Sequence, residues 1–572
     1  MKNIIKFMLV TLVFTSMVSC DSILEPIDEN RLDFDFVKTD PESAEGVLLN
    51  GYSRIPNQFT FNDVATDDAV NNQLNNSFKR MALGELNAQF NPISRWNNYE
   101  SILWLNQFLD IVEANEIVWS TNDEINEMFY MRMEGEALAL RALHHFYILQ
   151  AHAGVGTSGQ LLGVPYLTDF IESNGDFNTP RLSFEATVEA ILKDIDAALA
   201  LLPTDYSNNP SLVDEWYQDF DFSNYQVVNG KNYNLRMSGR VAKALKARVA
   251  LFAASPSFLN DQTYYNMAAN ISSEVLNTIG GVAGLAPNGV NYFTTYNEKN
   301  DVEMIWRGNI QGSPNSGIES RMFPPSVNGR GEVNPTQNFV DAFPMKSGLP
   351  ATTANGYDPQ NPYANRDPRL EEYVVVNGSS FGGGDINTGV GGNVDRLDSI
   401  PEFSTKTGYY LKKLLRPDVR LNDDGSSVGQ RHYDVYFRYT ELFLIFAEAA
   451  NEIGGPDQQI NGISPRDVIQ AIRQRAGIDQ PDAYLASIAT QDEMRNLIRN
   501  ERRLELSFEG HRFWDLRRWG LSLNEPVKGY FFDGTNYINL PSVEIRNFLS
   551  EYMPIPNNEV LRFPIIEQNA SW

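Results

Sequence analysis

The sequence has only one cysteine and few basic residues for its length. Lysine and arginine together number 46 against 73 aspartates and glutamates, which gives a formal net charge of -27 at pH 7. Because phosphate binding requires a basic surface, this charge argues strongly against a nucleic-acid partner and disfavours anionic membrane surfaces. A lone cysteine can form neither an internal disulfide nor a cysteine-based metal site, so its position requires another explanation.

Long apolar runs are also missing, and after the N-terminus no stretch is long and apolar enough to span a bilayer. Residues 1–19 contain two lysines, an apolar run over 7–14 and then small residues, which is the pattern of a secretory signal peptide. Residues 17–19, just before Cys20, resemble a bacterial lipobox, with methionine where leucine is usual. We therefore interpret Cys20 as the lipidated first residue of the mature protein and residues 20–40 as its acidic tether.

Catalytic motifs are missing as well. The chain has no Gly-rich phosphate loop, no HExxH pair and no G-x-S-x-G elbow. His145 and His152 could face the same way on one predicted helix, but no third metal ligand accompanies them. The loop over residues 61–72 is rich in Asp and Asn and could hold calcium, although we do not predict it. We expect no enzyme activity, no metal and no cofactor, but counting carboxylates does not exclude glycosidase chemistry in so acidic a chain.

What the chain does have is enough apolar material for a large core. Its 572 residues are 42% hydrophobic and 12% aromatic, so global disorder is excluded. Apolar residues recur at helical spacing in several segments, one of which begins at the N-cap residue Ser183 and stops at Pro203. The predicted helices cover residues 42–52, 96–119, 124–154, 183–202, 238–255, 439–453 and 465–476.

Successive helix pairs of about 35 to 45 residues, with Ala, Gly and aromatic residues at the contact positions, suggest a tetratricopeptide-like stack. We therefore expect a mainly α fold with a tetratricopeptide-like helical repeat scaffold. Between residues 256 and 431 the character changes, because Gly, Asn, Pro, Ser and Asp dominate and no long helical pattern persists. A segment of that length is too long for a passive loop. We therefore divide the mature chain into an N-terminal helical region (41–255), an irregular loop-rich ligand-binding insertion with short strands (256–437), and a C-terminal helical region with a tail (438–572).

Residues 492–520 carry apolar residues at roughly helical spacing, with glutamates and arginines between them. They predict an amphipathic helix stopped by Gly510, followed by a second short helix. Glu501 and Glu505 lie next to the apolar stripe and should be partly buried, where each carboxylate needs a cation. With His511 this cluster could be catalytic, but a structural role is the favoured interpretation. The nearest candidate cations are Arg512, Arg517 and Arg518.

Aromatic residues also stand in loops beside Asp and Asn. Sugars bind to such surfaces because their C–H faces stack on aromatic rings while their hydroxyls bond to amides and carboxylates. Trp96 and Trp306 lie at the edges of regular elements and could instead belong to the core. The candidate ligand-binding residues are Asp67, Asp68, Trp96, Trp216, Tyr292, Tyr296 and Trp306.

Several segments carry a family resemblance. The specific ones are RYTELFLIFAEAANEIGG (438–455), IRQRAGI (472–478), IRNERRLELSFEGHRFWDLRRWG (498–520) and the ending YMPIPNNEV...IIEQNASW. Weaker matches include GEALALRALHHFYILQAHAG (135–154) and GRVAKALKARVALFAASPSF (239–258). On these residues the chain resembles the SusD/RagB-type outer-membrane nutrient-binding lipoproteins of Bacteroidetes.

The resemblance implies a tetratricopeptide scaffold anchored at the cell surface through Cys20 and seated against a SusC-like TonB-dependent outer-membrane transporter. It implies capture of a glycan ligand, without chemistry of the protein's own. Uptake of peptides, as in RagB-like members, is the main alternative, and a secreted carbohydrate-active enzyme and a purely structural surface lipoprotein are others. Binding residues in this family sit in variable loops, so the seven candidates rest on loop position and residue type alone.

Overall fold

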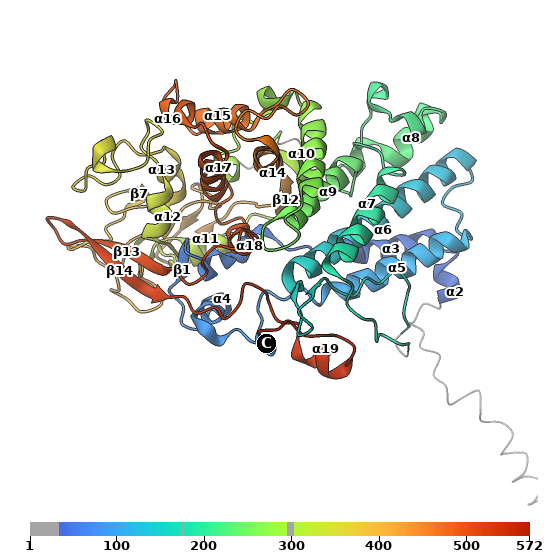
Figure 1. Cartoon of the computed structure of the whole chain (residues 1–572), viewed down its shortest axis with the longest axis horizontal. Coiled ribbons are helices and arrows are strands. Elements are labelled where there is room, and N and C mark those ends of the chain that lie inside the picture. Colours follow the sequence, from blue (N-terminus) through green and yellow to red (C-terminus); the bar gives the residue numbers. More distant parts are fainter. Residues whose placement is uncertain (1–33, 173–174, 295–301) are drawn as a thin grey trace, which may run out of the picture.

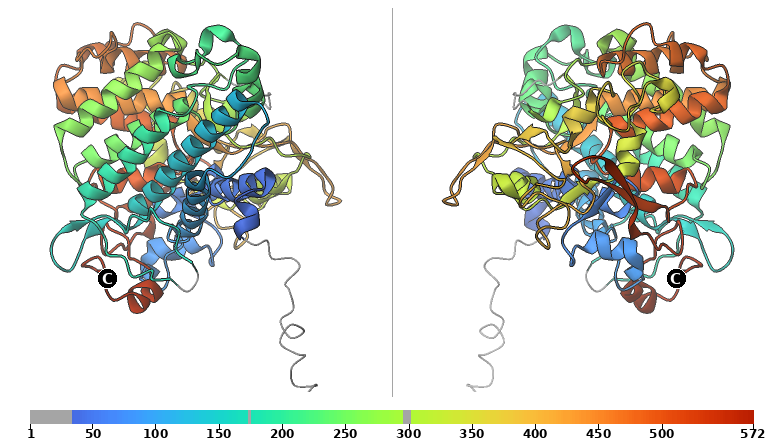
Figure 2. Two further views of the ribbon diagram at one scale, coloured as in Figure 1. Left: turned by 90° about the vertical axis from the view of Figure 1, so that its right-hand side faces the viewer. Right: turned by 90° about the vertical axis from the view of Figure 1, so that its left-hand side faces the viewer.

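The computed structural model describes residues 34–172, 175–294 and 302–572. Most long helices of the N-terminal half lie on one side of the molecule, and the loop-rich segments and the β13–β14 hairpin (Pro526–Phe532 and Tyr537–Ile545) lie on the other (Figure 1). Side views show the same separation, with the yellow and orange loops projecting away from the stacked helices (Figure 2). The prediction of a mainly helical fold with short scattered strands is confirmed.

The helices expected from hydrophobic spacing are present with small shifts at their ends. Side chains cap the N-termini of several of them: at α7, Ser183 accepts a hydrogen bond from the Ala186 amide, and at α9, Ser238 accepts one from the Val241 amide. These helices are α3 (Pro41–Leu49), α5 (Asn98–Ala114), α6 (Asp123–His152), α7 (Phe184–Leu199), α9 (Gly239–Ala254), α14 (Tyr439–Gly454) and α15 (Pro465–Arg475).

The prediction that no long helix lies between residues 256 and 431 is wrong, because α10 spans Gln262–Asn277. The Asp261 side chain caps it by accepting a hydrogen bond from the Thr263 amide. Helix α10 packs between α9 and α14. In the sequence, polar residues interrupt the apolar pattern of this helix, and its apolar face is buried by the two neighbouring helices. That face consists of Tyr264, Tyr265, Ala268, Ala269, Val275 and Leu276.

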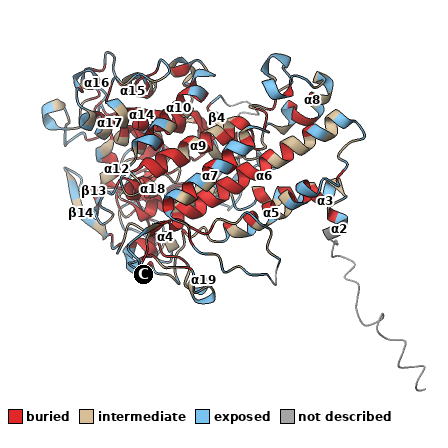
Figure 3. Ribbon diagram, turned by 45° about the vertical axis from the view of Figure 1, so that its right-hand side comes forward, coloured by how far each residue is buried: buried red, intermediate tan, exposed pale blue. Residues whose placement is uncertain are grey.

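The long helix α6 is the centre of the larger hydrophobic core. Its C-terminal half is buried on nearly every side, between α5 and α7, as the red ribbon shows (Figure 3). Gly135 permits one close approach, because a Cβ atom there would lie 2.8 Å from Cγ of Leu202. Helices adjacent in sequence therefore pack as neighbours, and the tetratricopeptide character of these pairs stays a prediction.

The loop-rich part has a core of its own. Buried aromatic residues such as Phe339, Phe343, Tyr373 and Tyr410 form it, and Phe508 joins it from beyond helix α17 (Gln491–Glu505). Two-stranded antiparallel sheets hold these loops together. They are β1–β5 (Ala69–Asn71, Val333–Pro335), β4–β12 (Met304–Arg307, Val435–Arg438), β6–β9 (Val374–Val375, Tyr410–Leu411), β7–β8 (Ser380–Phe381, Gly384–Asp385) and β10–β11 (Arg420–Leu421, Ser427–Val428).

The remaining elements are short and lie mostly in connections. They are α2 (Phe34–Val37), α4 (Ser77–Arg80), α8 (Phe222–Asn229), α11 (Gly317–Met322), α12 (Gln337–Ala342), α13 (Arg369–Tyr373), α16 (Ala483–Ser487), α18 (Arg512–Arg518), α19 (Asn557–Arg562) and the β2–β3 pair (Gly154–Val155, Leu161–Leu162).

Helix α17 begins at a capping box, in which Thr490 and Glu493 bond to each other's backbone amides. The expectation that Gly510 stops this helix is wrong, since the helix ends at Glu505. Phe508, at φ +61°, and Gly510, at φ +81°, both adopt left-handed conformations in the turn before α18. The chain thus reverses earlier than expected and places α18 against the loop at residues 62–68.

Glu501 and Glu505 are ion-paired, as predicted, and are completely buried where we expected partial burial, but the predicted cations are wrong. Glu501 pairs with Arg369 and Arg473, both at 2.8 Å, and Glu505 pairs with Arg369 at 2.9 Å and Arg475 at 2.8 Å. Arg369 comes from α13, which is remote in sequence, and Arg473 and Arg475 come from α15. We call Glu501, Glu505, Arg369, Arg473 and Arg475 the buried ion cluster.

The three arginines of α18 have other partners. Arg518 bonds to Glu448 of α14 at 2.7 Å, while Arg512 bonds to Asp67 at 2.9 Å. The Arg517 guanidinium lies 3.6 Å from the centre of the Phe513 ring. The arginines nearest in sequence to Glu501 and Glu505 are therefore not their partners in space, because Arg518 faces α14 and Arg512 faces the loop at residues 62–68.

Candidate ligand-binding site

Asp67 and Asp68 bind arginines of their own protein. Asp67 Oδ1 accepts from Arg512 Nε at 2.9 Å, and Asp68 Oδ1 accepts from Arg503 Nε at 2.7 Å. Burial alone would raise the pKa of Asp67, but Arg503 and Arg512 hold it below its usual range. Asp68 is completely buried, and that burial raises its pKa. These pairs join the loop at residues 62–68 to α17 and α18 and leave Asp68 no surface for a sugar.

Tyr292 and Trp306 lie in the core. Tyr292 is buried, donates to Oε1 of Gln58 at 3.2 Å and faces the Arg438 guanidinium. Trp306, on β4, is buried and donates from Nε1 to the Leu235 carbonyl at 2.8 Å. The expectation that these two rings stack on a ligand is corrected by their burial, because strand β4 turns its tryptophan toward the helices.

Trp96 and Trp216 retain some exposure. Trp96 is partly buried at the start of α5, where its ring packs edge-on against Tyr99 and His152. Trp216 is 42% exposed in the connection between α7 and α8, so it could contact a ligand. Tyr296 and the lipidation candidate Cys20 lie outside the described residues.

A surface groove of about 510 Å³ is present in the loop-rich part. The β10–β11 hairpin forms one wall, and the segment around residues 394–403 forms another. Phe403 is 37% exposed and presents an aromatic ring there. The lining residues include Asn328, Ile400, Phe403, Asn422, Asp423 and Ser427.

Local turns fix the polar wall of the groove. Asp424 accepts hydrogen bonds from the amide and hydroxyl of Ser426, which lower its pKa and close the hairpin turn. Gly425 has φ +83°, a conformation that favours glycine. Across the groove, Asn328 Nδ2 donates to the Leu421 carbonyl at 3.1 Å and to Asp423 Oδ1 at 2.9 Å. The amide and carboxylate are therefore held in place before any ligand arrives.

The exposed surface continues from the groove toward β1. The Arg330 guanidinium lies 5.6 Å from the centre of the Phe403 ring and donates to Gln73 Oε1 at 3.2 Å. Leu74 is 67% exposed, and its amide donates to Oε1 of Glu402 at 3.1 Å. An aromatic ring, carboxylates, carboxamides and a cation thus share one face, which suits a ligand with apolar C–H groups and many hydroxyls.

The sequence contained part of the signal for this groove. The Asn-Gly pair at 328–329 and the Asp-Gly pair at 424–425 mark turns. Phe403 was not singled out, because a phenylalanine in a polar loop more often covers a core. Only the tertiary structure shows that loops about seventy to one hundred residues apart along the chain meet around this ring.

The parts of the chain that the structure describes contain no group of three or more His, Asp or Glu side chains arranged to hold a metal ion. Within the same residues, no helix is both long and apolar enough to cross a membrane. The buried ion cluster has no access for a substrate, because Glu501 and Glu505 are fully buried. Its geometry therefore matches the structural interpretation of these carboxylates.

Comparison with known proteins gives consistent matches along the chain. Residues 290–572 match the model of the SusD family, and residues 42–213 match a model described as starch-binding associating with outer membrane. SusD-like protein P38 of Formosa agariphila is 23% identical over 532 residues, covering 90% of this chain and 91% of that protein.

Solved structures share the fold. A SusD-like protein from Bacteroides fragilis superposes with a TM-score of 0.73 at 22% identity, covering 96% of this chain and 100% of that one. A laminarin-binding SusD-like protein superposes with a TM-score of 0.59 at 20% identity, covering 93% and 100%.

The structure is thus a helical scaffold with a surface groove formed by loops. The chain belongs to the SusD/RagB family.

Proposed function

We propose that this protein is a cell-surface lipoprotein that captures oligosaccharides or polysaccharides and delivers them to a SusC-like TonB-dependent transporter. The observation that carries the proposal is the groove, where the exposed Phe403 ring lies beside the hydrogen-bonded pair Asn328 and Asp423. Support also comes from relatives described as a laminarin-binding SusD-like protein and as a SusD-like carbohydrate binding protein.

Capture requires no bond to be made or broken. The C–H face of a sugar ring would stack on Phe403 and displace water from both surfaces. Asp423 uses one oxygen for Asn328, so its other oxygen is available to a sugar hydroxyl. The fixed hairpin turn lowers the entropy lost on binding. Binding and release without chemistry suit a protein that hands its ligand to a transporter.

Replacing Phe403 with alanine is expected to weaken glycan binding about tenfold, because a stacked ring contributes about 0.5–1.5 kcal/mol beyond the area it buries. Affinity electrophoresis of the purified protein in gels containing laminarin, starch and other polysaccharides measures the effect. Phe36→Ala is the matched control, since Phe36 is also an exposed ring, at 49%, but lies on α2.

Other outcomes of the same assay decide between alternatives. If Trp216→Ala abolishes retardation and Phe403→Ala does not, the site lies at the candidate residue predicted from sequence. No retardation in any polysaccharide, together with peptide binding, would favour RagB-like peptide uptake. Sugar release from the polysaccharide, abolished by one Asp or Glu substitution, would favour a carbohydrate-active enzyme.

The anchor is tested separately. Cys20→Ala is expected to move the protein from the outer-membrane fraction to the soluble fraction, because it removes the thiol that carries the lipid. Immunoblots of fractionated cells measure the distribution, and detergent extracts of the wild-type membranes are examined for a copurifying β-barrel transporter. A Cys20→Ala protein that stays with the outer membrane contradicts lipidation, and an extract with neither barrel nor ligand favours a structural lipoprotein.

A further inference from the structure

A second cavity, separate from the groove, opens to the surface beside Asn57. It has a volume of about 110 Å³, room for a few water molecules at roughly 30 Å³ each. The loop around residues 56–62, helices α6 and α9, the β12–α14 junction and the turn before α18 line it. Asn57, which is exposed, stands at its edge.

The two carboxylates of this cavity are already neutralised. Glu441 accepts from Nε and Nη2 of Arg248 at 2.8 and 2.6 Å. Glu509 accepts from Arg438 at 2.7 Å and from Lys413 at 2.8 Å, and these cations hold its pKa at about 2 although burial alone would raise it. Both carboxylates are therefore already ion-paired and do not balance the charge of a further cation.

Arg95 also lines the cavity, and it has no such partner. Among the described residues no carboxylate forms an ion pair with its guanidinium and no aromatic ring stacks on it. Burial lowers its pKa, with only the Tyr147 phenol acting in the opposite direction. Arg517, which also has no carboxylate in ion-pair contact, lies instead against the rings of Phe513 and Phe548. Arg95 is half-buried and lacks that compensation, and a cation partly shielded from water without a counter-charge is unfavourable.

The other free groups at the cavity can donate hydrogen bonds. His511 Nδ1 accepts from Arg502 Nη2 at 3.4 Å, which assigns the proton of the neutral ring to Nε2. Burial lowers the pKa of His511 to about 4, so the ring is neutral at pH 7. The Gln150 carboxamide and the Trp514 indole N–H have no hydrogen-bond partner among the described side chains and backbone. Asn62 Oδ1 is buried and unpartnered, and its carboxamide can turn to present NH2 instead.

We propose that this cavity binds one small anion of the carboxylate or oxyanion class, held by the Arg95 guanidinium and by the N–H groups of Trp514 and His511. Such an anion supplies the missing counter-charge and accepts from donors that are otherwise unsatisfied. The volume admits acetate or sulfate and is too small for an oligosaccharide. The site is therefore separate from glycan capture.

Isothermal titration calorimetry of the mature protein with sodium acetate, and separately with sodium sulfate, tests the site in a low-salt buffer at pH 7.5. One saturable binding event is expected for at least one of the two anions. Arg95→Gln is expected to weaken it at least tenfold. Trp514→Phe, which keeps the packing and removes one donor, is expected to weaken it several-fold.

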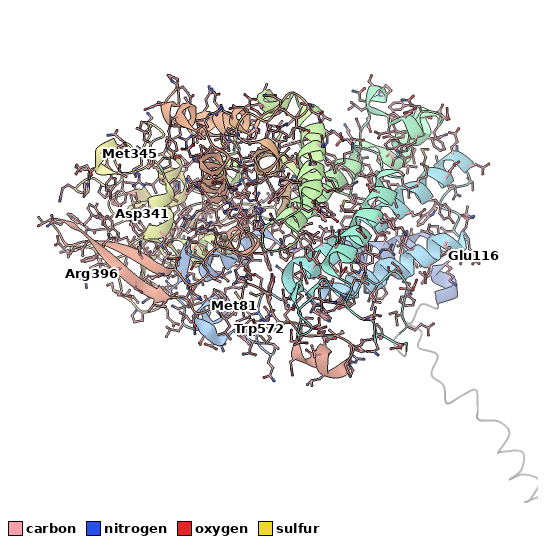
Figure 4. All side chains as sticks on the ribbon, in the orientation of Figure 1. Met81, Glu116, Asp341, Met345, Arg396 and Trp572 are labelled. Atoms are coloured by element: carbon pink, nitrogen blue, oxygen red, sulfur yellow. The ribbon has the colours of Figure 1, made fainter. Side chains whose placement is uncertain are left out.

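Arg396→Gln is the matched control, because Arg396 is exposed and lies in the loop-rich part (Figure 4). It is expected to bind the anion as the wild type does. Thermal unfolding of each variant establishes that it is folded. The proposal is overturned if neither anion gives a saturable isotherm, which would leave the cavity to water, or if a folded Arg95→Gln variant binds as tightly as the wild type.

Discussion

Glu505→Gln is expected to lower the free energy of unfolding by about 3–5 kcal/mol, because it removes one member of a buried network of charges. Glu505 is fully buried between Arg369 and Arg475, and its charge is compensated by both. Glutamine has the same shape but no charge, and its NH2 group would face a guanidinium. Burial favours the neutral form of Glu505, yet the surrounding arginines lower its pKa overall.

Urea unfolding at pH 7 measures this cost, and Glu116→Gln is the matched control. Glu116 is exposed at the end of the molecule opposite to Asp341 and Arg396 (Figure 4), and its substitution should change stability by less than about 0.5 kcal/mol. Glycan affinity per folded molecule should stay unchanged in Glu505→Gln. A variant of wild-type stability that has lost binding would show that the cluster takes part in ligand recognition.

Mild acid is expected to destabilise the protein steeply, by about 3 kcal/mol per pH unit between pH 6 and pH 5. Four histidines carry this effect, because burial lowers the pKa of His144 and His511 to about 4, of His152 to about 3, and of His145 well below its usual value. In the unfolded chain each histidine titrates near pH 6.5, so the unfolded state takes up protons that the folded state does not. Their contribution to stability is present above pH 6.5 and is lost as the pH falls.

Burial is the main reason why these rings stay neutral, and the N–H donors that face their second nitrogens act in the same direction. His152 Nδ1 donates to the Pro554 carbonyl at 2.9 Å, and its Nε2 accepts from the Arg95 amide at 3.2 Å. His145 Nδ1 likewise donates to the Arg141 carbonyl, while its Nε2 accepts from the Leu167 amide at 3.1 Å. A second proton would face an N–H donor in each case. Protonation therefore requires these contacts to break.

Two buried carboxylates have the opposite effect on the pH dependence of stability from that of the histidines. Burial raises the pKa of Asp63 to about 7, so the folded state holds a proton there that the unfolded state releases above pH 4, and burial shifts the pKa of Asp68 in the same direction. The net uptake on unfolding is therefore smaller than four protons. Urea unfolding at several pH values gives the slope, and His152→Gln should reduce it by about 1.4 kcal/mol per pH unit. An unchanged slope in that variant would assign the acid sensitivity to other groups.

Helices were predictable from sequence because their signals are local. Apolar spacing and a capping residue such as Ser183 act within a few turns of the chain, and the structure places α7 where both indicate. Helix α10 escaped prediction because its apolar face alternates with Asn and Ser and depends on α9 and α14 to be buried. The helical signal in this segment is weak, and packing against α9 and α14 stabilises the helix.

The candidate site shows the same division. The sequence indicated that a loop-rich segment would carry an aromatic and amide surface, and the groove lies in that segment. It could not indicate that Tyr292 and Trp306 turn inward, because an aromatic residue looks the same in sequence whether it faces solvent or core. Phe403 lines the groove only because loops distant in sequence pack around it.

By itself the sequence determined the net negative charge, the helical scaffold, a partly buried position for Glu501 and Glu505, and the resemblance to the SusD/RagB family. The tertiary structure decided which cations meet those carboxylates, because Arg369 is more than one hundred residues away and still lies within 3 Å of both. It also decided which loops meet to form the surface groove. Ion pairs and grooves depend on distances in space, and residue spacing along a chain constrains those distances only within a single helix or turn.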